Sequence, residues 1–428
     1  MARTDTLPHF LTDVANAIRT KAGTSGTIQA SAFDTAIANI PSGGGTTEAV
    51  EKDINFYDYD GTRVYSYTND EFMELSEMPA NPSHTGLTAE GWNISYNSDE
   101  ALGTIQDFIT AWGLGENTKV KLDIGQTYCT DDDSTRIYVD IPEHTKTITL
   151  VIEVEEEGAT IDWGDGSTPE TVYPQSGSGD WAASPKTPHT YANAGQYTIS
   201  IDGVVYLWGD STYGSILLCD GTNNKDRTEY QRLITKIECG SNTIMDIRCF
   251  NSLINLEALS ISKAQYDNGV LLEQIDNCLK LKCLIIPFNN DLIPQVTNCN
   301  IEVFSAYSEG IDYLEISNCK LLKRLSLYAD NGGVIIINAF HNLPNIIEVN
   351  FINQIENIPE NSFLNCHSLK AIRFGRYQFN VPTLEDINAF SGLPSDYKIY
   401  VPESLYEDWI GDTNWEDIAD HIIAIPDI

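Results

Sequence analysis

The hydrophobic positions of the C-terminal half recur in one short phrase. Each copy begins with Ser, Asn or Gly followed by Cys or Leu, and the clearest copies place apolar residues at the fifth and eighth positions, before a β-rich run. The seven copies are spaced 25, 21, 20, 24, 23 and 27 residues apart and begin at Ser252, Asn277, Asn298, Asn318, Asn342, Asn365 and Gly392. Repeats of this length indicate a solenoid, in which stacked units bury one continuous core. We therefore expect residues 205–428 to form a solenoid with its short strands in one sheet along a face.

The sequence of these repeats resembles the BspA-type leucine-rich repeats of bacterial and phage surface proteins, most closely over residues 361–372. The resemblance continues through residues 399–405, Trp409 and Trp415, which look like the end segment that closes such arrays. Only the third copy departs, because one residue is missing before Ile301, and we interpret this as a distorted turn within the array. The resemblance implies a solenoid that binds a partner, since such arrays seldom catalyse.

Aromatic residues in or beside the solenoid strands are the candidate receptor contacts. Aromatic rings stack on sugars and anchor protein interfaces. Each candidate could equally be a buried strand residue. The candidates are Tyr307, Tyr313, Tyr328 and Phe351.

Four of the nine cysteines occupy the second position of the phrase, where other copies carry Leu. Free Cys commonly acts as a small buried hydrophobe, so we expect a ladder of buried thiols. Disulfides or a metal cluster are the alternatives, although no paired C-x-x-C spacing occurs. The four cysteines are Cys278, Cys299, Cys319 and Cys366.

Residues 145–204 combine an alternating strand, a Trp-Gly-Asp-Gly turn and a second strand. They resemble a polycystic-kidney-disease-type (PKD) domain, an immunoglobulin-like sandwich in which Trp163 would fill the core. Asp162 and Asp165 could hold Ca²⁺ or cap backbone amides of the turn. We favour capping, because Ca²⁺ takes about six to eight oxygen ligands. We expect no bound metal and no cofactor.

In the block of residues 46–144, residues 54–67 alternate apolar and polar positions on both sides of Asp60-Gly61, which predicts a hairpin. A short helix near residues 99–112 and strands near 120–124 and 136–141 follow. The block resembles the small β-grasp-like modules found beside repeats in surface proteins.

The hairpin turn contains a motif that also occurs in enzymes. Asp58-Tyr59-Asp60-Gly61-Thr62 resembles the first motif of haloacid-dehalogenase-type phosphatases. Such an enzyme needs its Asp at the end of a buried parallel strand that leads into a helix, whereas here another alternating strand follows directly. We therefore predict a turn and no enzyme activity.

Residues 1–45 carry apolar residues at helical spacing in two short segments, followed by a Gly-rich linker. Two such helices cannot build a core alone, so they must pack on copies of themselves or on another protein. The segment resembles the N-terminal attachment region of tail proteins from phages of Gram-positive gut bacteria; a plain helical hairpin covering the next domain is the alternative. The candidate attachment residues are Leu7, Phe10, Leu11, Val14, Ile18, Phe33 and Ile37.

Charge and hydropathy narrow the function classes. The 428 residues include 62 acidic and 25 basic ones, a net charge of −37, which repels nucleic acid and anionic lipid. No apolar run reaches the roughly 18 to 20 residues of a membrane span, and the N-terminus lacks the pattern of a secretory signal. We expect neither nucleic-acid binding nor membrane insertion.

Together these patterns predict a multidomain, mainly β protein with short helices: an N-terminal helical anchor, a β-grasp-like module, a PKD-like sandwich and a leucine-rich-repeat solenoid. This order is typical of a phage tail fibre or receptor-binding protein. Its expected partners are other tail or baseplate proteins and a host-surface glycan or protein. We expect a homo-oligomer, by analogy a trimer, at the tail tip of a virion that reaches the extracellular space by lysis. The alternative is a bacterial leucine-rich-repeat adhesin.

Overall fold

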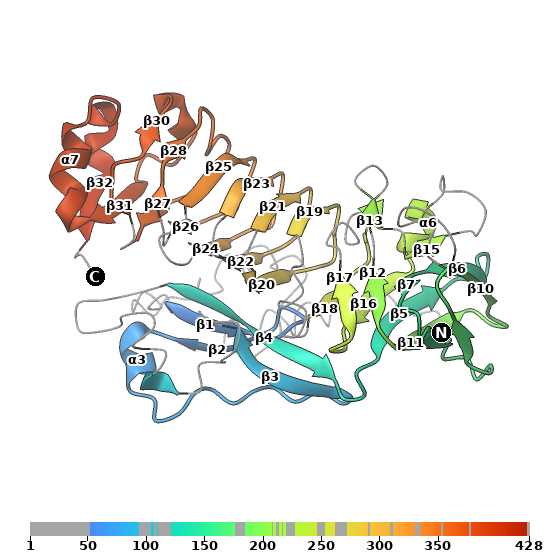
Figure 1. The fold of residues 1–428 in the computed structure, drawn as a ribbon. Helices are drawn as coiled ribbons and strands as arrows, with labels where there is room; N and C mark the ends of the chain where they lie inside the picture. The colour runs from blue at the N-terminus through green and yellow to red at the C-terminus, as the bar shows by residue number, and fades with distance from the viewer. Residues whose placement is uncertain are drawn as a thin grey trace, which may run out of the picture. The chain divides into compact units, whose positions relative to one another are not determined.

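The structure is a computed structural model and describes residues 52–93, 104–106, 109, 121–175, 185–207, 209–210, 214–215, 217–219, 227–245, 253–261, 272–289, 292–308, 311–329, 334–351, 354–375 and 378–425. These residues form a mainly β protein with a few short helices and a C-terminal β-solenoid (Figure 1). The predicted anchor, residues 1–45, lies outside them, and so does most of the helix predicted near 99–112.

The first sheet has the strand order β2-β1-β4-β3. The predicted hairpin is confirmed, since β1 and β2 pair antiparallel, while β4 runs parallel to β1. Phe56, Phe72 and Trp92 fill the core beneath this sheet. The elements are β1 (Ile54–Tyr57), β2 (Arg63–Tyr67), α3 (Asn69–Met73), β3 (Leu87–Asn93) and β4 (Leu122–Thr130).

The next strands form a six-stranded sheet of order β18-β16-β5-β11-β8-β9 and a three-stranded sheet of order β10-β6-β15. Both sheets contribute side chains to one buried cluster, which includes Trp163 at 1% exposure. The larger sheet contains β5 (Thr135–Ile141), β8 (Ala159–Asp162), β9 (Glu170–Val172), β11 (Gly195–Asp202), β16 (Ile234–Glu238) and β18 (Ala258–Ser260); the smaller contains β6 (Thr147–Val151), β10 (Lys186–Thr190) and β15 (Leu218–Cys219).

The strand predicted at 136–141 does not finish the first block. As β5 it pairs with β11 on one side and β16 on the other. Because β16 in turn pairs with β18 in the first repeat, one sheet runs from the middle of the chain into the solenoid. The predicted domain boundaries at residues 144 and 204 therefore separate strands that share a sheet. Smaller elements here are β7 (Glu153–Val154), β12 (Val205–Leu207), β13 (Gly209–Asp210), β14 (Gly214–Ser215), α6 (Arg227–Gln231) and β17 (Thr243–Met245).

The solenoid carries two parallel sheets along its length and not the single one expected (Figure 1). The first has the order β19-β21-β23-β25-β27, with β19 (Leu272–Asp276), β21 (Leu292–Thr297), β23 (Ile311–Ser317), β25 (Val334–His341) and β27 (Gln354–Ile355). The second, here called the long sheet, contains β20 (Cys283–Asn289), β22 (Val303–Ser308), β24 (Arg324–Ala329), β26 (Glu348–Phe351), β29 (Ala371–Phe374), β31 (Lys398–Pro402) and β32 (Ile422–Ile425). The phrases that begin at Asn277, Asn298, Asn318 and Asn342 each form the corner between a strand of the first sheet and the next strand of the long sheet.

The end of the array is closed by helical turns and one last strand. Trp409 and Trp415 are fully buried there and lie 5.3 Å apart between ring centroids. The elements are β28 (Asn357–Ile358), β30 (Thr383–Leu384) and the short helices η4 (Ile387–Phe390), η5 (Glu403–Leu405), α7 (Tyr406–Gly411) and η6 (Glu416–His421).

The Asn that opens a repeat makes the corner possible. Asn298, Asn318 and Asn342 have φ values of 54°, 57° and 58°, a left-handed conformation that Asn and Gly tolerate better than other residues. Gly392, at the same repeat position, has a φ of 86°. The side chains also form a ladder, since Asn342 Nδ2 donates to Asn318 Oδ1 at 2.9 Å and Asn365 Nδ2 donates to Asn342 Oδ1 at 2.7 Å.

We expect Asn342→Ala to lower the free energy of unfolding by about 2 kcal/mol, because Ala strains the left-handed corner and breaks the ladder. Asn342→Gly keeps the backbone conformation and should cost only about half as much. Urea unfolding of both variants measures the difference. Equal losses would show that the ladder, and not the backbone, requires Asn.

The residue after each Asn is buried, as predicted. Cys278 and Cys299 are 0% exposed and Cys319 is 1% exposed. The Cys299 thiol donates to the carbonyl oxygen of Thr297 at 3.2 Å. Burial raises the pKa of the Cys366 thiol to about 12, so it stays protonated at neutral pH. All eight described cysteines are buried, which confirms the predicted burial of Cys278, Cys299, Cys319 and Cys366.

The third repeat stays in the array despite its missing residue. Leu322 N donates to Cys319 O at 3.2 Å, and Leu369 N donates to Cys366 O at 3.0 Å, so these repeats place a tight turn after the Cys. The third repeat is one residue shorter at this turn, yet Ile301 and Phe304 are fully buried. The prediction that the third repeat does not end the array is therefore confirmed.

Candidate interaction surfaces

The long sheet has one face toward the solenoid core and one face away from it. Leu325, Val349 and Ile372 pack in the core in adjacent strands. Because side chains alternate along a strand, the residues one position further on lie on the opposite face. We call this the outer face. Its central row, in register across the sheet, is Ile285, Ser305, Ser326, Asn350, Arg373, Tyr400 and Ile423.

Strand β4 of the first sheet covers the beginning of the outer face (Figure 1). At Gly125 a Cβ atom would lie 2.9 Å from Ile285 Cβ, so only glycine allows this close approach. Asp123 Oδ1 accepts a hydrogen bond from Arg324 Nε at 2.7 Å, and its Oδ2 accepts one from Ser326 Oγ at 3.3 Å. The Asp123 side chain is 1% exposed. The first sheet is thus joined to the solenoid by a buried ion pair.

A second set of charges extends this contact. Glu348 accepts from Lys121 Nζ at 2.5 Å and also from Arg373 Nε. Arg373 in turn lies over the ring of Tyr400, with its guanidinium carbon 3.9 Å from the ring centroid. Arg373 is 28% exposed at its side chain and Ile423 is 36% exposed. The outer face therefore becomes more exposed to solvent toward its C-terminal end.

The structure places the predicted receptor contacts at different positions. Tyr307 and Tyr328 are register partners in β22 and β24 of the long sheet, whereas Tyr313 belongs to β23 of the other sheet. The side chains of these tyrosines lie outside the described residues. Phe351 is 1% exposed and packs 5.8 Å from Phe340 between ring centroids, so it is a buried strand residue, the alternative that the sequence left open.

The predicted attachment residues fall in the part of the chain that the structure does not describe. They are Leu7, Phe10, Leu11, Val14, Ile18, Phe33 and Ile37, all before residue 52. Their role stays a prediction.

A groove of about 770 Å³, here called the hairpin groove, lies where three parts of the chain meet. The hairpin turn contributes Tyr59, the six-stranded sheet contributes Tyr138 and Lys236, and the edge of the early repeats contributes residues such as Lys282 and Leu321. No local sequence pattern connects the three parts, so the groove could not be predicted from the sequence.

A buried carboxylate organises the wall of the hairpin groove. Glu238, with a side chain 3% exposed, accepts from Tyr138 Oη at 2.7 Å, Tyr59 Oη at 3.3 Å and Lys236 Nζ at 2.7 Å. Burial and Glu238 raise the pKa of both tyrosines, so both hydroxyls remain protonated donors. The Lys236 ammonium also lies 3.8 Å from the centroid of the Tyr138 ring. These side chains are held in place before any ligand arrives.

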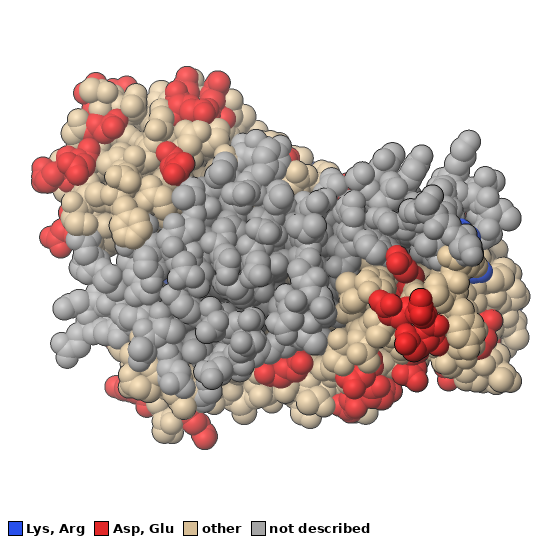
Figure 2. Space-filling model, viewed as in Figure 1, with Lys and Arg blue, Asp and Glu red and all other residues tan. Residues whose placement is uncertain are grey.

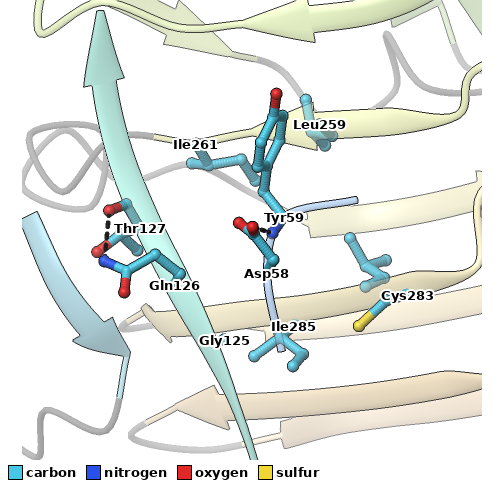
Figure 3. A pocket seen from close by; sticks show the side chains of 10 residues that line it. Asp58, Tyr59, Gly125, Gln126, Thr127, Leu259, Ile261, Cys283 and Ile285 are labelled. Atoms are coloured by element: carbon cyan, nitrogen blue, oxygen red, sulfur yellow. Dashed lines mark hydrogen bonds between the residues drawn. The ribbon is translucent and has the colours of Figure 1, made fainter. Parts of the chain in front are cut away.

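Behind the hairpin turn lies a small cavity of about 30 Å³, shown in Figure 3. A cavity of this size holds about one water molecule and no organic ligand. Asp58, on its wall, accepts from Tyr128 Oη at 3.0 Å and lies 2.8 Å from His84 Nε2. The motif shared with phosphatases therefore forms the turn of an antiparallel hairpin, as predicted, and Asp58 is occupied by structural contacts.

The Trp-Gly-Asp-Gly turn shows the predicted capping. Asp162 Oδ1 accepts from Gly164 N at 2.9 Å, and Asp165 Oδ1 accepts from Ser167 N at 3.0 Å. Asp165 Oδ2 also lies 2.9 Å from His189 Nε2, whose ring stacks on Trp163 at 4.5 Å. Hydrogen bonds from Ser167 and His189 outweigh burial and lower the pKa of Asp165 to about 2.

A lowered pKa in the folded state means that ionised Asp165 stabilises the fold above its ordinary pKa of 3.8, and that this contribution disappears as the pH falls through about 2. We expect Asp165→Asn to lower stability at pH 6 by up to about 2 kcal/mol. The gap from wild type should close between pH 4 and pH 2, as measured by thermal unfolding. A stability difference that is the same at pH 4 and at pH 2 would contradict the lowered pKa of Asp165.

The described residues on the face shown in Figure 2 include many acidic ones. In Figure 2 carboxylate residues gather in several patches and basic residues are barely visible. Among the described residues no group of three or more His, Cys, Asp or Glu side chains is placed to hold a metal ion. Within the same residues, no helix is long and apolar enough to cross a membrane.

No protein-family model and no curated protein matches this chain.

Proposed function

We propose that this chain is a tail fibre or receptor-binding protein of a phage or phage-derived particle, attached by its N-terminal segment and bound to a host-surface receptor through its C-terminal repeats. The β-solenoid carries the proposal, because a long stacked array offers an extended recognition surface. In this proposal the repeats are of the BspA type. The strands around Trp163 are a PKD-like spacer, and residues 46–144 are a β-grasp-like module.

The open part of the outer face is the region of the solenoid that we assign to the receptor. Arg373 and Tyr400 form a cation–π pair there, and Ile423 adds an exposed apolar side chain in the same row. Arginine and tyrosine are enriched among the residues that dominate binding interfaces. Phe351 is no longer a candidate, since it lies in the core.

Two measurements test this function. The absolute mass of the full chain, compared with that of a chain starting at Thr46, should fall from an oligomer to a monomer if the N-terminal segment assembles the fibre. Labelled protein should bind cells in a panel of Gram-positive gut bacteria, and the truncated chain should retain that binding but no longer attach to particles. A truncated chain that still sits on particles, or a full chain that binds no cells, would overturn the proposal.

The second candidate is a bacterial surface adhesin, which the same solenoid would suit. The two candidates differ in location: the fibre protein is attached to a particle by its N-terminal segment, whereas the adhesin is displayed on a bacterial cell. Detection of the chain on a bacterial surface with no particle present would favour the adhesin.

A further inference from the structure

The structure points to a second binding site, and we propose that the hairpin groove binds a neutral oligosaccharide of the host surface. This inference rests on the proposed function, since it names a ligand class for receptor recognition. The groove has a volume of about 770 Å³, which lies within the range of about 300–1,000 Å³ typical of small-ligand sites.

The charge of the groove differs from that of the whole protein. The chain carries a net charge of −37, yet the groove is lined by equal numbers of acidic and basic residues, so its lining sums to zero. Two of these opposite charges pair with each other, with Lys280 Nζ 3.1 Å from Glu257 Oε1. A neutral lining gives no net attraction to an anionic or cationic ligand and does not repel an uncharged one. The charged residues are Asp60, Glu257 and Glu302 against Lys236, Lys280 and Lys282.

The kinds of side chain in the groove match the chemistry of sugars. Tyr59 and Tyr138 bring aromatic rings, and Leu279 and Leu321 are each 42% exposed, so both can contact the apolar faces of sugar rings. Ammonium groups donate hydrogen bonds and carboxylates accept them, and each hydroxyl of a sugar can do both. A ligand rich in hydroxyls therefore finds both kinds of partner along the groove.

The Glu238 network makes this groove a prepared site. Glu238 accepts hydrogen bonds from both tyrosine hydroxyls and from the Lys236 ammonium, so these groups lose little freedom when a ligand binds. The tyrosines come from the hairpin turn and from β5, segments about 80 residues apart that only the folded chain brings together.

The test is an array of short neutral oligosaccharides, with acidic oligosaccharides and peptides on the same surface, probed with the labelled full chain. We expect neutral oligosaccharides to retain the protein. Lys282→Ala and Leu321→Glu should each weaken the affinity for the best of them by about tenfold. Both residues are exposed, so the fold should be unchanged, which circular dichroism verifies.

Two matched controls lie in later repeats, outside the groove. Lys370→Ala changes an exposed lysine at the same repeat position as Lys282, and Ile347→Glu adds a carboxylate at an apolar side chain that is 47% exposed. Both should bind like wild type. Retention only by acidic oligosaccharides or peptides, no retention at all, or equal binding by groove variants and controls would each overturn the inference.

Cell binding separates this inference from the proposed function. If groove variants bind bacteria as wild type does and the array is empty, the groove inference fails and the receptor-binding function stands. If wild type binds no bacteria but neutral oligosaccharides still require Lys282, the site stands and the fibre proposal fails.

Discussion

Arg324→Met is expected to lower the free energy of unfolding by about 3–5 kcal/mol, the largest effect of a single charge removal that we expect in this protein. The substitution leaves Asp123, 1% exposed, without its cation between β4 and the long sheet. Burial alone would lower the pKa of Arg324, but Asp123 raises that pKa above its ordinary value, so the guanidinium is charged in the native state. Ser326 and Asn55 would remain as hydrogen-bond donors to Asp123, but neither carries a charge that offsets the carboxylate. Chemical unfolding followed by tryptophan fluorescence measures the loss.

Lys323→Met is the matched control, one residue earlier in the chain. Lys323 also forms an ion pair of 2.7 Å, with Glu302, but the two side chains are 52% and 37% exposed. Water screens such a pair, and we expect a loss of no more than about 1 kcal/mol. The two ion pairs have the same length, so the comparison isolates burial. Similar losses for both variants would mean that β4 is not seated on the solenoid as described.

A double variant, Asp123→Leu with Arg324→Met, tests the cause. If the single substitution is costly because it strands a buried charge, removal of both charges should restore much of the stability. A double variant that is no more stable than Arg324→Met would attribute the loss to side-chain packing.

Phe351→Ala is expected to cost about 3–5 kcal/mol, because it opens a cavity in the solenoid core. Phe351 is 1% exposed and has Phe340 at 5.8 Å and Phe374 at 5.7 Å between ring centroids. Phe351→Leu keeps most of the volume and should cost less than about 1.5 kcal/mol. Urea unfolding checks both values.

The same pair of variants separates a core role from a receptor role. The Leu variant should bind host cells as wild type does, because the ring of Phe351 does not reach the surface. A stable Leu variant with lost cell binding would return Phe351 to the receptor site.

Structural features that depend on residues close together in the sequence could be predicted well. The repeat phrase specified the solenoid, because a left-handed Asn and the buried Cys or Leu after it need only local geometry and one apolar position. The Asp60-Gly61 turn and the capping carboxylates Asp162 and Asp165 follow from the same short-range chemistry. The predicted number of sheets in the solenoid was wrong. The strand before each Asn shows a weaker pattern of apolar positions than the strand after it, so only one strand per repeat was predicted.

Local patterns in the sequence were enough to predict the repeat architecture, the corner residues, the buried thiols, the hairpin and the excess of acidic residues. Three long-range contacts were visible only in the folded chain: β5 pairs with β11, Asp123 binds Arg324, and Tyr59 and Tyr138 both donate to Glu238. This difference arises because periodicity and turn chemistry act over a few residues. The partner of a buried charge or of a sheet edge, in contrast, is chosen by packing between segments up to about 200 residues apart.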